Sequence, residues 1–216
     1  NGATAIGLDH RIAQPSQTQL GGAASDALLL EATRAAGHVV YPFESESPLA
    51  SDTTVLGHLL VSPSQDHVVR AMPLATELGA QTVSAFGLQL FELTHPQTRP
   101  TGTMALVNYA GDGSLGSLQA ISFAALWEAL DTHQDERLNG WFKDKVVVFL
   151  PDSAPAATWL LPTGQSVSGS AIHLHLLNML LTNNRICRLG MVSSNLVTLL
   201  LAGLIAHATN SSVPSA

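Results

Sequence analysis

Four polar residues follow short apolar segments and could together bind a small ligand. Asp9, Asn108 and Asp152 each come after an apolar run that is typical of a β-strand, and Tyr41 stands at the end of another such run. In α/β folds, ligands bind in the crevice outside the carboxyl ends of parallel strands. If these strands are parallel, two carboxylates, an amide and a phenol converge on one polar site. The alternative is that the Asp and Asn residues cap helices and form turns.

The histidines do not predict a metal site. His173 and His175 are two positions apart in a predicted helix, so their rings point to different sides of it. Metal-binding pairs on helices are spaced by three or four residues. We therefore expect His173 to be a packed or capping residue, and we predict neither a metal nor a cofactor.

A hydrolase is the enzyme alternative. The sequence around Ser114 is GDGSLGS, but the nucleophile elbow G-x-S-x-G requires glycine where Asp112 stands. The same loop lacks the Lys-Ser/Thr ending of a phosphate-binding loop. We therefore assign no catalytic residue in this chain, while a soluble α/β enzyme with a buried C-terminal helix stays open as the alternative.

Composition narrows the class of protein. Of 216 residues, 46% are hydrophobic and 12% are charged, which is too apolar for a disordered chain. The formal net charge of −7 and the scattered Lys and Arg residues argue against nucleic-acid binding, which needs a basic surface. Cys187 is the only cysteine, so the chain can form neither an internal disulfide nor a zinc site with several cysteines.

The order of apolar runs predicts an α/β fold. Residues 3–9 indicate a buried strand, residues 26–37 a helix that ends at a glycine, and residues 38–42 a second strand. Strand, helix and strand in this order form a βαβ unit, so the two strands should be parallel. Residues 57–61 and 67–74 surround a Ser/Pro/Asp segment and predict a hairpin.

The remaining elements complete a layered architecture. Val83, Phe86, Leu90 and Leu93 share one helical stripe. Residues 145–150 (KVVVFL) are the most strand-like run and favour a central strand that is covered on both faces. We therefore predict a layered, mostly parallel sheet with a hairpin and helices on both faces.

The C-terminal segment has the length and apolar character of a membrane helix. Residues 189–208 contain no Asp, Glu, Lys or Arg, and their number is about what a bilayer core requires. We expect a membrane helix over residues 188–208 and a tail over residues 209–216, with a buried helix of a soluble protein as the alternative. Arg185 and Arg188 precede the segment, which by the positive-inside rule alone would place the domain in the cytoplasm.

Four stretches, taken in order, resemble the CHASE domain of type two. The stretches are GATAIGLD with DALLLEATRAAGHVVYP, LGHLLVSPSQDHVVRAMPL, LVNYAG with ISFAALWEAL, and FKDKVVVFLPDSAP to TWLLPTGQSVSGSAIHLHLLNMLLTN. They match the family's opening strand, the Gly-His hairpin, the Asn-Tyr strand end, and the closing strand and helix. The resemblance covers residues 1–187, which we expect to be an N-terminally truncated sensor domain.

The resemblance implies a bacterial receptor. In that family the sensor domain lies outside the inner membrane, in the periplasm or the extracellular space. A cytoplasmic histidine kinase, adenylate or guanylate cyclase, diguanylate cyclase or Ser/Thr kinase follows the membrane helices. The expected partners of this chain are therefore the membrane, a small-molecule or protein ligand and a second copy in a homodimer, but no nucleic acid. The family has no shared ligand motif that could identify the ligand.

Overall fold

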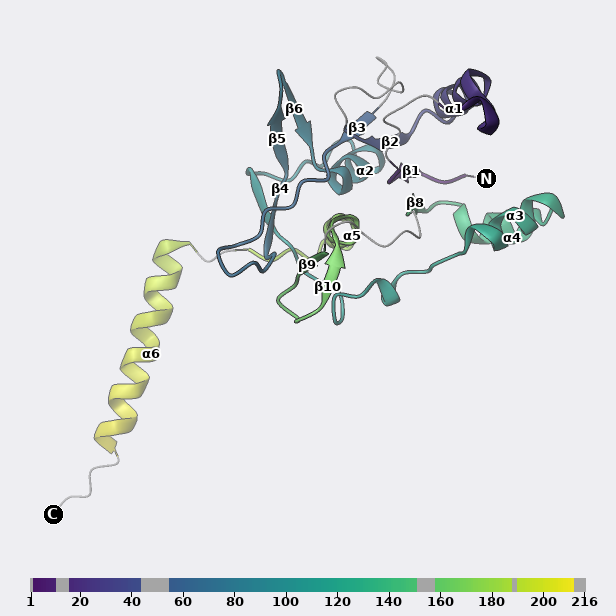
Figure 1. Ribbon diagram of the computed structural model, residues 1–216. Helices are drawn as coiled ribbons and strands as arrows, with labels where there is room; N and C mark the ends of the chain where they lie inside the picture. The colour runs from purple at the N-terminus through teal and green to yellow at the C-terminus, as the bar shows by residue number, and fades with distance from the viewer. Residues whose placement is uncertain (1, 11–15, 44–54, 151–157, 188–189, 212–216) are drawn as a thin grey trace. The chain divides into compact units, whose positions relative to one another are not determined.

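The computed structural model describes residues 2–10, 16–43, 55–150, 158–187 and 190–211. The chain divides into two units, Asn1–Arg185 and Ile186–Ala216, and each is described by itself. The first unit contains the α/β domain and the second contains one long helix (Figure 1).

A four-stranded parallel sheet is the main scaffold of the first unit. Its strand order is β3 (Val55–Gly57), β2 (Val39–Pro42), β1 (Ala5–Leu8) and β8 (Val146–Phe149). The helix α1 (Gly22–Ala36) connects β1 to β2. The predicted βαβ unit and the parallel sheet are therefore confirmed.

Helices cover both faces of this sheet. On one face, Tyr41 and Val39 of β2 pack against Leu29 and Leu30 of α1. On the other face lies α2 (Phe86–Thr94), which is so close to β1 that a Cβ on Gly7 would come within 2.8 Å of the Phe86 ring. Glycine at this position lets the helix pack directly on the strand backbone.

The strand β8 does not have the central position that its sequence predicts. It pairs with β1 alone, so it is an edge strand of the sheet as described, and its side chains are half-buried or exposed. A continuous apolar run is typical of a central strand, but it determines neither how many neighbours the strand has nor how far its faces are covered. The prediction of a central strand at residues 145–150 was wrong for this reason.

The hairpin predicted from residues 57–61 and 67–74 is not formed, and that prediction was wrong. The polar segment does turn, with Ser64 N donating to Val68 O, but the residues on its two sides pair elsewhere. His58 bridges to Ala85, and Val68 bridges to Leu160. The hairpin that the structure shows consists of β5 (Ala75–Leu78) and β6 (Gln81–Ser84).

This hairpin also moves the start of the predicted helix. Val83, which the sequence pattern placed on a helical stripe, lies in β6, and α2 begins only at Phe86. Gly79 has a φ of +64°, which suits the turn between β5 and β6, and Thr82 and Val83 favour a strand.

The helix α5 (Gly169–Leu181) is the most deeply buried helix of the first unit. Ser168 caps it by accepting a hydrogen bond from Ala171 N at 3.2 Å. Nearly every side chain from Ala171 to Leu180 is buried, so α5 is a core helix. It packs against α2, as Figure 1 shows.

The other elements of the first unit extend this core. β4 pairs with β7 and β9 pairs with β10, each pair being antiparallel, and α3 packs against α4. Ser122 caps α3 by accepting a hydrogen bond from Ala125 N at 3.2 Å. The bounds are Ala71–Pro73 for β4, Met104–Leu106 for β7, Thr158–Leu160 for β9, Ser166–Ser168 for β10, Phe123–Asp131 for α3 and Asp135–Phe142 for α4. Two short 3₁₀ helices lie at Thr18–Leu20 and Leu115–Ser117.

The second unit contains α6 (Met191–Ser211), whose described leucines and isoleucine are exposed. Within the described residues, no helix combines the length and the apolar character that a membrane crossing needs. The predicted membrane helix over residues 188–208 is therefore not supported.

Candidate functional site

Asp9 and Tyr41 lie near the same edge of the parallel sheet but belong to opposite faces. Asp9 follows β1 directly, is buried, and its backbone N–H donates to Phe149 O at 3.0 Å. The Tyr41 hydroxyl forms a 2.6 Å hydrogen bond with Thr33 Oγ1 on α1. Leu8 packs on the same face as Tyr41. Because side chains alternate along a strand, Asp9 belongs to the α2 face.

Asn108 belongs to a different part of the fold. It follows β7, which pairs with β4 and not with the parallel sheet. Its backbone N–H contacts Met179 Sδ at 3.4 Å, and its side-chain amide donates to Asn184 O at 3.1 Å. Asp152 lies outside the described residues. The structure therefore does not bring Asp9, Tyr41 and Asn108 together, and their shared ligand role stays a prediction.

Asn108 instead lines a polar pocket at the carboxyl end of α5. The pocket has a volume of about 190 Å³. It lies between the loop that follows β7 and the last turn of α5. Its lining consists of Asn108, Tyr109, Ala110, Gly111, Asn178, Met179, Thr182 and Asn184.

The pocket offers neutral hydrogen-bonding groups. The side-chain amides of Asn178 and Asn184 make no hydrogen bond to other described residues, so each presents a free donor and a free acceptor. Thr182 Oγ1 donates to Asn178 O at 2.7 Å. Tyr109 is fixed by donating to Val69 O at 2.9 Å, and burial raises the pKa of its phenol, so it stays neutral. The lining contains no carboxylate, ammonium or guanidinium.

A second polar feature lies inside the core, on the same helix. His173 of α5 and His58, which follows β3, are each at most 1% exposed. Their rings meet edge to face, with centroids 5.9 Å apart and planes at 78°. The ring of Phe86 lies against His173 in a similar geometry at 6.4 Å.

The nitrogens of this pair are poorly satisfied. His58 Nδ1 accepts a 3.3 Å hydrogen bond from Leu60 N, which leaves the proton of the neutral ring on Nε2. Among the described residues, His58 Nε2 and both ring nitrogens of His173 have no partner of good hydrogen-bond geometry. A buried polar group without a partner is costly, and such groups call for a functional or structural explanation.

Burial governs the protonation of the pair. Desolvation lowers the pKa of His58 to about 4. Desolvation and, to a smaller extent, the neighbouring His58 lower the pKa of His173 to about 3, against a weak contact with the Leu59 backbone that raises it. Both rings are therefore neutral at physiological pH, and a proton on either would be a buried charge without a counter-ion.

His175 has a different environment, two positions along α5. Its Nε2 pairs with Gly113 O at 2.8 Å, and its ring contacts Tyr109 edge to face. The prediction that His173 and His175 point to different sides is confirmed, and His173 is packed as expected. In the part of the chain that the structure describes, no group of three or more His, Cys, Asp or Glu side chains is arranged to hold a metal ion.

The contact between His58 and His173 was not predicted from the sequence. The two rings are separated by more than a hundred residues, and no spacing rule connects them. The available signal was their occurrence in two motif-bearing stretches, LGHLLV and SGSAIHLHLLN. Asn178 and Thr182 were also visible as a pair four apart on one helical face, but their meeting with Asn108 is a tertiary contact.

Comparison with known protein families decides the identity of the domain. The family model of the CHASE2 domain matches residues 1–208 of this chain. The chain belongs to the CHASE2 family. CHASE2 domains are sensory domains of extracytoplasmic receptors and are not catalytic. No curated protein and no solved structure matches the chain significantly.

Proposed function

We propose that this CHASE2 domain is the extracytoplasmic input domain of a bacterial receptor in the inner membrane. Its signalling part, a kinase or a nucleotide cyclase, would lie outside this chain. The family match supports the sensory role. The family resemblance implies the kinase or cyclase, and it also implies that two copies of the domain form a homodimer.

We further propose that the domain senses a small, uncharged polar molecule in the pocket at the end of α5. The observation that carries this proposal is a pocket of about 190 Å³ whose lining includes three asparagines, Asn108, Asn178 and Asn184, and no charged group. Amides bind neutral polar ligands by donating and accepting hydrogen bonds, and they fix orientation at a low desolvation cost.

The position of the pocket suggests how binding would be transmitted. Asn178, Met179 and Thr182 belong to the last turn of α5 and the residues after it, from which the chain continues toward the second unit. A ligand that binds only one arrangement of these residues shifts the population toward that arrangement. The same chain segment would then carry the change onward.

Thermal unfolding of the 216-residue chain with a library of sugars, polyols and small neutral amides at pH 7.5 tests the pocket. A ligand at about 100 times its Kd adds about 2.7 kcal/mol, which raises the Tm by roughly 5–10 °C for a domain of this size. Asn178→Ala should abolish the shift, whereas Asn139→Ala on the exposed surface of α4 should keep it. A ligand whose shift is unchanged in Asn178→Ala would contradict the site.

A further inference from the structure

Two buried titratable residues, His58 and His173, do not line the pocket at the end of α5. They meet where the end of β3, the start of α2 and the middle of α5 come together. His58 is part of the scaffold there, because its N–H donates to Ser84 O and its carbonyl accepts from Phe86 N.

The backbone segments around the two rings are closely packed. A Cβ on Gly57 would come within 2.5 Å of Phe86 Cα, and a Cβ on Gly87 would come within 2.3 Å of His173 O. The elements on both sides of the rings are therefore in direct backbone contact. Separation of these elements would let water reach a protonated imidazole, because close-packed interiors have few voids as large as a water molecule.

No counter-ion is placed to stabilise a charge on the pair. The titratable groups on the packed elements are Glu92 of α2 and His175 of α5, and β3 and β6 carry none. Glu92 pairs with Arg99 at 3.0 Å, and His175 bonds to Gly113 O. Among the described residues, no carboxylate contacts either ring of the pair.

We propose that His58 and His173 form an acid-responsive element, in which proton uptake by the two buried rings opens the contact between α2 and α5. The closed form excludes protons and the open form admits them, so acid shifts the population toward the open form. The opening itself is a property of the fold. Only its role as an input signal rests on the proposed sensory function, since α5 also lines the ligand pocket.

The number of protons taken up on opening is the measurable signature. With open-state rings of ordinary pKa near 6.5, the two histidines together should raise the opening equilibrium about 50-fold between about pH 6 and about pH 5. Each single substitution should reduce this contribution to about sevenfold, and the double substitution should remove it.

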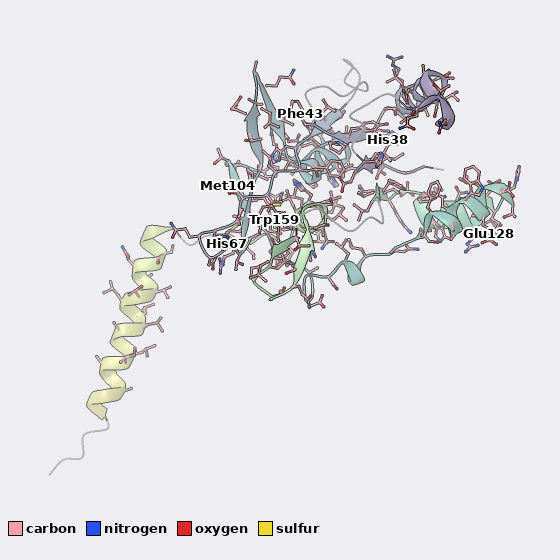
Figure 2. The ribbon with its side chains drawn as sticks, viewed as in Figure 1. His38, Phe43, His67, Met104, Glu128 and Trp159 are labelled. Carbon is pink, nitrogen blue, oxygen red and sulfur yellow. The ribbon has the colours of Figure 1, made fainter. Side chains whose placement is uncertain are left out.

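Hydrogen exchange of the α5 amides in the 216-residue chain measures the opening equilibrium. The variants are His58→Asn, whose side-chain oxygen can still accept from Leu60 N, His173→Phe, which keeps a ring in the core, and the double variant. His67→Asn is the control. His67, labelled in Figure 2, is exposed and has a φ of +63°, which asparagine tolerates.

The expected result is a stepwise loss of acid-induced exchange from wild type through the single variants to the double variant, with His67→Asn unchanged. Equal acid dependence in wild type and in the double variant would overturn the proposal. A ring titration by NMR on the wild type decides the matter if a variant fails to fold: folded-state midpoints near 6.5 would also overturn it. Ligand binding at pH 7.5 is scored separately, so a failure of the pocket is distinguishable from a failure of the acid response.

Discussion

Substitution of Gly87 by alanine tests the packing on which both polar sites depend. The added Cβ would lie 2.3 Å from His173 O, 3.2 Å from its carbonyl carbon and 3.4 Å from Leu177 N. All three are backbone atoms, so no side chain can rotate away. Because carbon contacts are optimal at about 3.5–4.0 Å, α2 and α5 must separate locally by about 1 Å, which forfeits a quarter to a half of each affected dispersion contact.

The expected cost of Gly87→Ala is about 2 kcal/mol. Overpacking costs about 1–3 kcal/mol, and the helix propensity of alanine returns up to about 1 kcal/mol of it. Urea denaturation monitored by circular dichroism measures the free energy of unfolding. Gly140→Ala is the matched control, because a Cβ there meets nothing within 4 Å in the exposed helix α4, and it should be neutral or stabilising by up to about 1 kcal/mol. Equal stability changes in the two variants would refute the close contact of α2 with α5.

Three further predictions concern single groups. The pKa of His173 is lower in the folded chain than the ordinary 6.5, so its contribution to stability is complete above pH 6.5 and is lost as the pH falls toward about 3. At pH 5 this loss is about 2 kcal/mol of the free energy of unfolding. Urea titrations should show the loss in the wild type and a smaller loss in His173→Phe. An equal loss in both proteins would contradict the lowered pKa of His173. Tyr41→Phe should cost about 1 kcal/mol in the same assay, because the buried bond to Thr33 Oγ1 is lost, and a neutral result would argue against that bond. Ser168→Ala should cost about 0.5–2 kcal/mol and increase amide exchange at Ala171, because α5 loses its N-cap; unchanged exchange would show that the cap is not formed.

The sequence predicted the elements whose signals are local. The βαβ unit followed from periodicity and from Gly37, which adopts the expected left-handed φ of +71° at the end of α1. The N-cap Ser122 was predictable in the same way. These features depend on residues within a few positions of one another, so one sequence contains all the information that they need.

The predictions that were wrong concern pairing between segments that are distant in the sequence. Residues 67–74 have the strand pattern that was expected, but pattern alone does not choose between a hairpin partner and β7. β8 shows the same limit, since hydrophobicity does not distinguish an edge strand from a central one. The ligand residues were predicted by assuming one sheet, and β7 lies in another, so Asn108 joined Asn178 and Asn184 and not Asp9.

In the proposed function, α5 connects the polar pocket to the chain segment that leaves the first unit. Amide chemical shifts of residues 169–187, recorded by NMR with and without a saturating pocket ligand at pH 7.5, test it most directly. We expect changes in amide chemical shift that begin at Asn178 and continue through Thr182 and Asn184 to Cys187. Changes confined to the loop that follows β7, with α5 and the residues after it unaffected, would contradict it.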